Sequence, residues 1–145
     1  MAMATEVRRS LIRTVIVLTL ASAITACAGG QAAKPLKELQ RAHSGSLDVV
    51  MLSDSDALRQ GKGAVVLEFR DGAGKLVDVG MVTVNATMTM PGMAPMFGDN
   101  SVKPTDTKGR YEVATDLGMA GMWRFTVAWN GPAGSGSVSM PGTAL

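Results

Sequence analysis

The sequence is poor in the residues that form most catalytic centres. Its 145 residues include one cysteine, Cys27, and one histidine, His43. A single cysteine cannot form a disulfide within the chain. A single imidazole, lying before the part of the chain that we expect to fold, cannot serve a Ser-His-Asp or Cys-His arrangement. We therefore expect that the protein is not an enzyme.

Long apolar runs are also lacking. The run at residues 14–23 covers only about half of the roughly twenty residues that a membrane-spanning helix needs. It follows Arg8, Arg9 and Arg13 and precedes small residues, which is the order of a secretory signal peptide. We predict that residues 1–26 are a signal peptide that is removed. The Arg8-Arg9 pair leaves open whether export follows the twin-arginine route.

The end of this leader resembles a bacterial lipobox, in which a branched apolar residue and two small residues precede a lipidated cysteine. The matching residues are Ile24-Thr25-Ala26-Cys27. The alternatives are a free thiol, or an ordinary signal-peptidase site at Ala26-Cys27-Ala28. The lipobox predicts a protein of the bacterial cell envelope that Cys27 anchors to a membrane, facing the periplasm or the cell exterior.

The excess of positive charge belongs to the leader. Removing residues 1–26 takes away three arginines and one glutamate, so that eleven residues of each sign remain in the mature chain. A neutral exported domain lacks the basic surface that nucleic acid requires. We expect no nucleic-acid partner.

Two regions follow the leader. Residues 27–46 are rich in Gly, Ala, Lys and Gln, and we predict a lipid-anchored tether in which residues 36–42 could form a helical turn or two. From residue 47 to residue 145 the sequence consists of short runs in which apolar and polar residues alternate, separated by turn residues such as Asp71-Gly72 and Asn130-Gly131. Runs of this kind lie at residues 47–52, 65–70, 82–90, 111–113, 123–129 and 135–140.

This alternation predicts an all-β fold. About seven short antiparallel strands with glycine-rich turns are typical of an immunoglobulin-like β-sandwich. The apolar faces of the runs predict a core of Val65, Leu67, Phe69, Val82, Val84, Tyr111, Val113, Trp123, Phe125 and Val127.

Methionine is the residue in excess, and most of it falls in two clusters. One cluster holds Met88, Met90, Met93 and Met96, and the other holds Met119 and Met122. A thioether is a soft, neutral ligand that favours Cu(I), and it withstands oxidising compartments better than a thiol. The clusters therefore indicate a soft-metal site of Met90, Met93, Met96, Met119 and Met122.

Methionine also fills gaps in apolar cores, and this alternative stays open for the clusters. Met88 shares one face of its run with Val82 and Val84, so we assign it to the core. Met93 and Met96 follow Pro91-Gly92 and flank Pro95, which take the chain out of the strand and onto a loop.

The region from Leu47 to Met140 resembles the YtkA-like domain, a relative of the FixH family. The similarity is carried by residues 63–69, by Met88-Thr-Met-Pro-Gly-Met-Ala-Pro-Met96, by Gly109-Arg-Tyr-Glu-Val113 and by residues 121–127. The resemblance implies an immunoglobulin-like sandwich of the bacterial envelope, associated with heavy-metal efflux adaptors or with assembly of copper-containing oxidases. Many relatives carry a histidine near the methionine loop, whereas residues 93–99 contain none, which favours Cu(I) over Cu(II).

Two functions of different classes follow. The first is a copper-handling lipoprotein that binds Cu(I) through the methionines for buffering, delivery or efflux. The second is an interaction module without metal, in which residues 91–97 and 118–123 dock on an efflux or oxidase-assembly complex through an adaptable methionine surface.

Overall fold

A computed structural model describes residues 34–145, which form a β-sandwich of eight antiparallel strands. The strands are β1 (Lys37–Ser44), β2 (Leu47–Ser53), β3 (Gly61–Arg70), β4 (Met81–Met88), β5 (Met96–Pro104), β6 (Arg110–Leu117), β7 (Gly121–Gly131) and β8 (Gly134–Ala144). Residues 34–145 contain no helix, and therefore none that could cross a membrane. The predicted signal peptide, Cys27 and the first part of the predicted tether lie outside the described residues.

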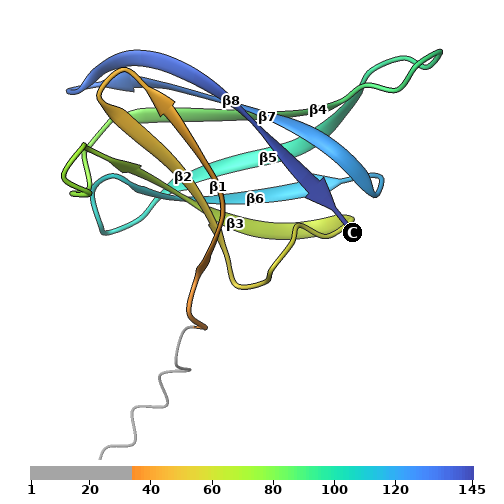
Figure 1. The fold of residues 1–145 in the computed structure, drawn as a ribbon, viewed down its shortest axis with the longest axis horizontal. Helices are drawn as coiled ribbons and strands as arrows, with labels where there is room; N and C mark the ends of the chain where they lie inside the picture. Colours follow the sequence, from red (N-terminus) through yellow and green to blue (C-terminus); the bar gives the residue numbers. More distant parts are fainter. Residues whose placement is uncertain (1–33) are drawn as a thin grey trace, which may run out of the picture. The chain divides into compact units, whose positions relative to one another are not determined.

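The strands are ordered β1-β2-β3-β6-β5-β4-β7-β8, and β5 belongs to both layers of the sandwich (Figure 1). Its first residues pair with β4, ending at Gly98 opposite Ala86. Its remaining residues pair with β6, beginning with Asp99 opposite Asp116. The β2–β3 loop closes the sandwich against the last residue, because the Leu145 amide donates to the Leu58 carbonyl at 2.9 Å.

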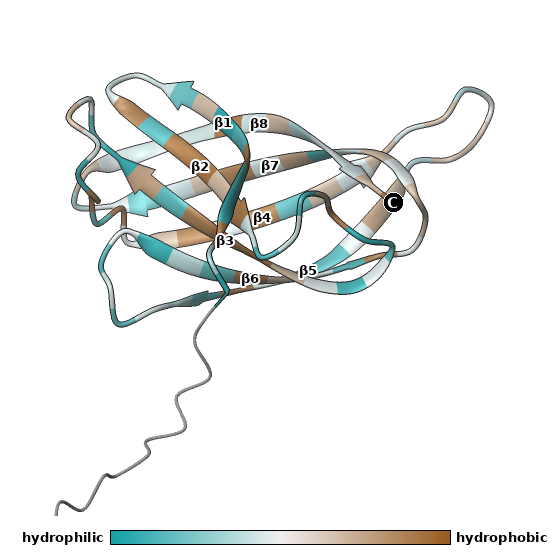
Figure 2. Ribbon diagram, turned by 60° about the horizontal axis from the view of Figure 1, so that its bottom comes forward, coloured by the Kyte–Doolittle hydropathy of each residue, from teal (hydrophilic) through white to brown (hydrophobic). Residues whose placement is uncertain are grey.

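The core lies between the two layers and follows from the alternation of side chains along each strand. Figure 2 shows apolar and polar bands alternating along β2 and β3. All ten predicted core residues are buried, which confirms the all-β sandwich that the sequence predicts. Buried residues outside that prediction include Val49, Met51, Leu117, Trp129 and Met140.

Strand β1 corrects the prediction for residues 36–42. These residues form no helical turn; most of them pair with β2, as in Ala42 opposite Val49. Leu39 and Ala42, spaced as on one face of a helix, both pack against the core. A β-bulge between Glu38 and Gln40 shifts the register, which allows this spacing in a strand. The β-structure therefore begins at Lys37 rather than at Leu47.

Strand β5 is a second strand that the sequence pattern does not predict. Its residues Met96–Pro104 include few apolar side chains, and those that face inward are separated by Gly98 and Asn100. A Cβ atom at Gly98 would lie 3.0 Å from Leu117 Cδ2 and 3.1 Å from Ala86 Cβ. Only a residue without a side chain fits easily where the strand passes from one layer to the other.

Candidate functional site

The first methionine cluster lies on the hairpin that joins β4 and β5. Met88 and Met96 are opposite each other in the register, and residues 89–95 form the connection. The Met93 amide donates to the Met90 carbonyl at 3.2 Å, and Gly92 has a φ of 76°. Proline followed by a residue with positive φ is the signature of a type II turn. Residues 90–93 therefore fold back on themselves, and the short hairpin carries Met88, Met90, Met93 and Met96.

The second cluster lies beside the first. Residues 118–120 connect β6 to β7, and the Met96 Cε atom lies 3.7 Å from the position that a Cβ atom would take at Gly118. The Trp123 indole Nε1 donates to the Met119 carbonyl at 3.0 Å, which ties this turn to the core. The two clusters, separated in the sequence, are thus brought to the same end of the sandwich.

The methionines differ in exposure. Met90 and Met96 are half-buried and pack against the core. Met93, at the tip of the hairpin, is 60% exposed, and Met119 is 37% exposed. Met90 and Met96 are therefore half-buried, and Met93 and Met119 are open to solvent.

Met122 is separated from this group by strand alternation. Its neighbour Trp123 is buried in the core, so the Met122 side chain lies on the outer face of β7, where it is 70% exposed. There it lines a surface groove with Thr87, Thr89 and Arg124. Of the five predicted ligands, Met122 is the one that the fold directs away from the half-buried pair.

Met88 belongs to the core, as the sequence indicates. It is only 4% exposed, and a Cβ atom at Gly121 would lie 2.6 Å from its Cε atom. Gly121 therefore provides the space that the Met88 methyl group occupies.

Harder metal-binding groups do not gather within residues 34–145, where no three His, Cys, Asp or Glu residues are placed to hold an ion. His43, which the sequence analysis places in the tether, lies instead in β1, opposite Asp48. Its Nδ1 atom contacts Asp48 Oδ1 at the exposed edge of the sheet. His43 lies in a strand and not in a tether because β1 pairs with β2.

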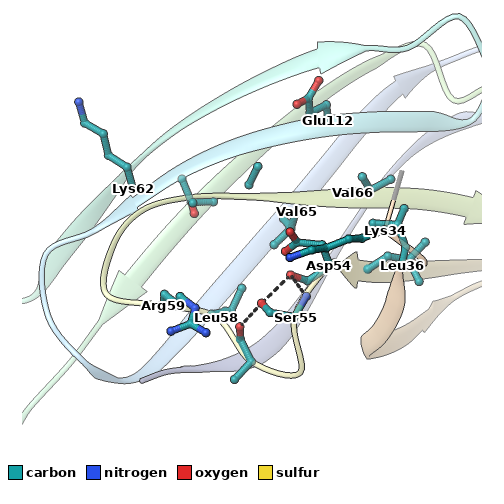
Figure 3. A pocket seen from close by; sticks show the side chains of 16 residues that line it. Lys34, Leu36, Asp54, Ser55, Leu58, Arg59, Lys62, Val65, Val66 and Glu112 are labelled. Atoms are coloured by element: carbon teal, nitrogen blue, oxygen red, sulfur yellow. Dashed lines mark hydrogen bonds between the residues drawn. The ribbon is translucent and has the colours of Figure 1, made fainter. Parts of the chain in front are cut away.

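A separate groove of about 510 Å³ lies where the chain enters β1 (Figure 3). Its rim carries Lys34, Asp54 and Arg59, and its floor includes Leu52 and Val66. The adjacent Ser55 hydroxyl donates to the Ala57 carbonyl at 2.8 Å, which shapes the β2–β3 loop. The charges on the rim are of both signs.

Sequence reasoning missed a buried carboxylate on the outer face of β3. The Glu68 side chain is 1% exposed and contacts Arg70 and Arg110. The Nε atoms of both arginines donate to its two oxygens at 2.8 Å. Burial alone would raise the pKa of Glu68, but the hydrogen bonds from Arg70 and Arg110 outweigh it and lower the pKa below its ordinary value. The only sequence signal is the Glu68-x-Arg70 spacing, which puts both side chains on one face.

The same face continues toward the sheet edge with Arg41. Its guanidinium donates to Glu38 at 2.7 Å and to Asp48 at 2.9 Å. Hydrogen bonding to Arg41 is the main cause that lowers the pKa of Glu38. Desolvation would raise the pKa of Asp48, but hydrogen bonds from Arg41 and His43 lower it. These pairs organise the outer face of the sheet and lie on β1 and β2, away from the methionine hairpin.

The chain is similar to a known protein family and to solved structures. A family model described as YtkA-like matches residues 43–128. Among solved structures, the chain is similar to the Lin-41 filamin domain, with 15% identity and a TM-score of 0.41. That similarity covers 63% of this chain and 88% of the filamin domain. No curated protein matches the chain.

Proposed function

The chain belongs to the YtkA-like family, and from this premise we propose that it is an envelope lipoprotein that binds Cu(I) through methionines. The observation that carries the proposal is the approach of the β6–β7 turn to the methionine hairpin, where Met96 lies against Gly118, the residue before Met119. Methionines that served only to fill the core would not need to reach the solvent, as Met93 and Met119 do.

We assign the ligands to Met90, Met93, Met96 and Met119. The half-buried pair, Met90 and Met96, provides an apolar surrounding that favours a soft ion over a hydrated hard cation. The exposed pair, Met93 and Met119, lies on loops and completes a three- or four-thioether site by closing over the ion. Met122 is left out of the set because it lies on the outer face of β7.

Methionine coordination suits a carrier rather than a permanent cofactor site. Thioethers bind Cu(I) without releasing a proton, and as neutral ligands they add no negative charge to the complex. The ion can therefore be exchanged with another soft site. We propose that the protein buffers Cu(I) or passes it to a partner in the envelope, such as a metal efflux adaptor or an oxidase-assembly protein. Cys27 holds it at the membrane through a lipid anchor.

The first prediction tests the sulfur ligands. Replacing Met93 and Met96 by leucine keeps the apolar volume and removes two donors, so each change should cost less than about 1.5 kcal/mol of stability. Cu(I) affinity should fall sharply. Competition of the mature chain with a colorimetric Cu(I) chelator under reducing conditions measures this loss directly.

Three controls accompany this experiment. The variants are Met88→Leu in the core, Met81→Leu at the opposite end of the sandwich and Met122→Leu on the outer face of β7. We expect each variant to compete with the chelator for Cu(I) as the wild type does. If the wild type takes no Cu(I) from the chelator, or if the double leucine variant competes equally well, the copper proposal fails. The methionine end is then an interaction surface without metal.

A further inference from the structure

The first residues of β3 form an open strand edge in the middle of a sheet. Strand β3 pairs with β6 from Gly61 to Glu68, but it pairs with β2 only from Val66 to Arg70. Strand β2 ends at Ser53 and leaves the sheet through the β2–β3 loop. Among the described residues, positions 61–65 therefore have a strand neighbour on the β6 side only.

The backbone groups of Lys62 and Ala64 face this open side. The Phe69 amide donates to the carbonyl of Gly109, the residue before β6. The backbone groups of successive residues in a strand point to opposite edges. Residues at even distances from Phe69 therefore point to β6, whereas Lys62 and Ala64 point away from it. Within residues 34–145 these two residues have no backbone partner on that side, which leaves two amides and two carbonyls open.

The groove of about 510 Å³ beside this edge takes the position that β2 would occupy if it continued (Figure 3). Strands β1 and β3 are the two neighbours of β2. Lys34 and Leu36, which lead into β1, line one side of the groove, and residues 62–66 line the other. Because one strand position is missing between them, the gap has the width that a single extended chain fills.

Gly63 supports the approach of another backbone at this edge. A Cβ atom at Gly63 would meet only Thr115 Oγ1, at 3.7 Å, so packing within the fold does not require glycine there. Gly63 also lines the groove. Glycine within a strand often marks a place where another backbone comes close.

We propose that the groove binds an extended segment of a partner protein, which pairs with β3 through the backbone of Lys62 and Ala64. Strand addition at an open sheet edge takes its affinity from backbone hydrogen bonds and its specificity from alternate side chains. The side chains that face the groove are small or apolar, because Leu36, Leu52 and Leu58 line it. This inference goes beyond the proposed copper function and requires no metal ion.

The open edge leads toward the turn that carries Met119. Lys62 is opposite Asp116, near the end of β6, and the Gln60 side chain donates to the Gly118 carbonyl at 3.0 Å. A strand bound along β3 therefore ends beside the β6–β7 turn. A partner held in this way lies next to one of the proposed copper ligands.

The probe is a phage-displayed library of random peptides, selected on the mature chain from Cys27 onward, made without the leader and kept reduced. The tightest peptide is synthesised, and its binding is measured by fluorescence anisotropy. Ala64→Pro removes an amide that faces the groove and leaves the pairing with β6 in place, since an open edge tolerates proline. Binding should weaken by about tenfold, the effect of losing one backbone hydrogen bond and leaving its partner unpaired. Ala64→Val keeps the amide and should bind as the wild type does.

Hydrogen exchange followed by NMR tests the wild type directly, and so does not depend on the folding of Ala64→Pro. Without peptide, the Lys62 and Ala64 amides should exchange rapidly, whereas pairing with β6 protects those of Gly63 and Val65. Saturating peptide should slow exchange at Lys62 and Ala64 by about tenfold or more.

The proposal fails if no peptide is selected, if a folded Ala64→Pro variant binds as tightly as the wild type, or if the two amides stay open in the complex. Slow exchange of both amides before peptide is added would also overturn it. That result would mean that the groove is filled by residues 27–33 or by a second copy of the chain.

Discussion

At the scale of single residues, the outer face of the sheet depends on Glu68, a buried carboxylate held by two arginines. Its side chain is 1% exposed, whereas those of Arg70 and Arg110 are 32% and 40% exposed. Breaking a buried ion pair by removing one partner usually costs several kcal/mol, because it leaves the other charge unpaired. Here both arginines reach water, so part of that cost is recovered by hydration.

We therefore predict that Glu68→Gln lowers the free energy of unfolding by about 1 to 3 kcal/mol at neutral pH. Urea denaturation of the mature chain measures the loss. Glu112→Gln is the matched control, because Glu112 is an exposed glutamate on the neighbouring strand β6. We expect this control to stay within about 0.5 kcal/mol of the wild type.

The same carboxylate predicts how stability varies with pH. The pKa of Glu68 is lower in the folded protein than its ordinary value of 4.5. The stability that ionised Glu68 contributes is therefore fully present above pH 4.5 and is lost as the pH falls through the lower, folded-state pKa. The difference in unfolding free energy between wild type and Glu68→Gln should shrink below pH 4.5, and a constant difference would contradict this account.

At the scale of elements, β5 is the strand that joins the two layers, and Gly98 is the residue at which it changes partners. The position of a Cβ atom at Gly98 is also 3.3 Å from the Asp116 carbonyl oxygen, so the backbone of β6 limits the space as much as the Leu117 side chain does. Because β5 begins directly after the methionine hairpin, the packing at Gly98 also positions Met96.

We predict that Gly98→Val destabilises the protein by about 1 to 3 kcal/mol, because a branched side chain would overpack this site. Gly63→Val is the matched control: Gly63 also lies in a strand, and a Cβ atom there would meet only Thr115 Oγ1 at 3.7 Å. Valine suits a strand better than glycine does, so the control should be unchanged or slightly more stable. Thermal unfolding followed by circular dichroism measures the stability of both variants. Equal changes in Gly98→Val and Gly63→Val would contradict the crowding at Gly98.

At the scale of the whole molecule, the start of β1 and the methionine hairpin lie apart: Glu38 is level with Lys103 near the end of β5 across the register, whereas Met96 begins β5. Lys37 begins β1 opposite Ser53, next to the β2–β3 loop, and this loop contacts the last residue of the chain, Leu145. A lipid on Cys27 would thus hold the start of β1 near the membrane, and the methionine hairpin lies away from that point (Figure 1).

We predict that Cys27→Ser releases the protein from the membrane fraction or leaves it unprocessed, because no other residue can supply the thiol for lipid attachment. Fractionation of cells expressing wild type and variant measures the release. Mass spectrometry of the mature wild-type protein should find a lipid-modified N-terminal cysteine. A mature N-terminus elsewhere, without lipid, would contradict the lipobox.

The fold class and about half of the core follow from the sequence alone. Runs such as Val65–Phe69 and Trp123–Val127 alternate with period two, and a strand with one buried face requires that pattern wherever its partners lie. For the same reason Met88 could be assigned to the core from its neighbours Val82 and Val84. The YtkA-like resemblance was also visible in the sequence alone.

The tertiary structure decided what depends on pairing between distant segments. Strand β1 has helical spacing of its apolar residues, and only the bulge and the edge of β2 make it a strand. Met96 and Gly118 come together because β5 changes partners at Gly98 and then runs beside β6. Met122 faces outward because its strand register buries Trp123. The alternation of apolar and polar residues along a strand shows which of its faces is buried, but not which strand pairs with it. The candidate site depends on that pairing.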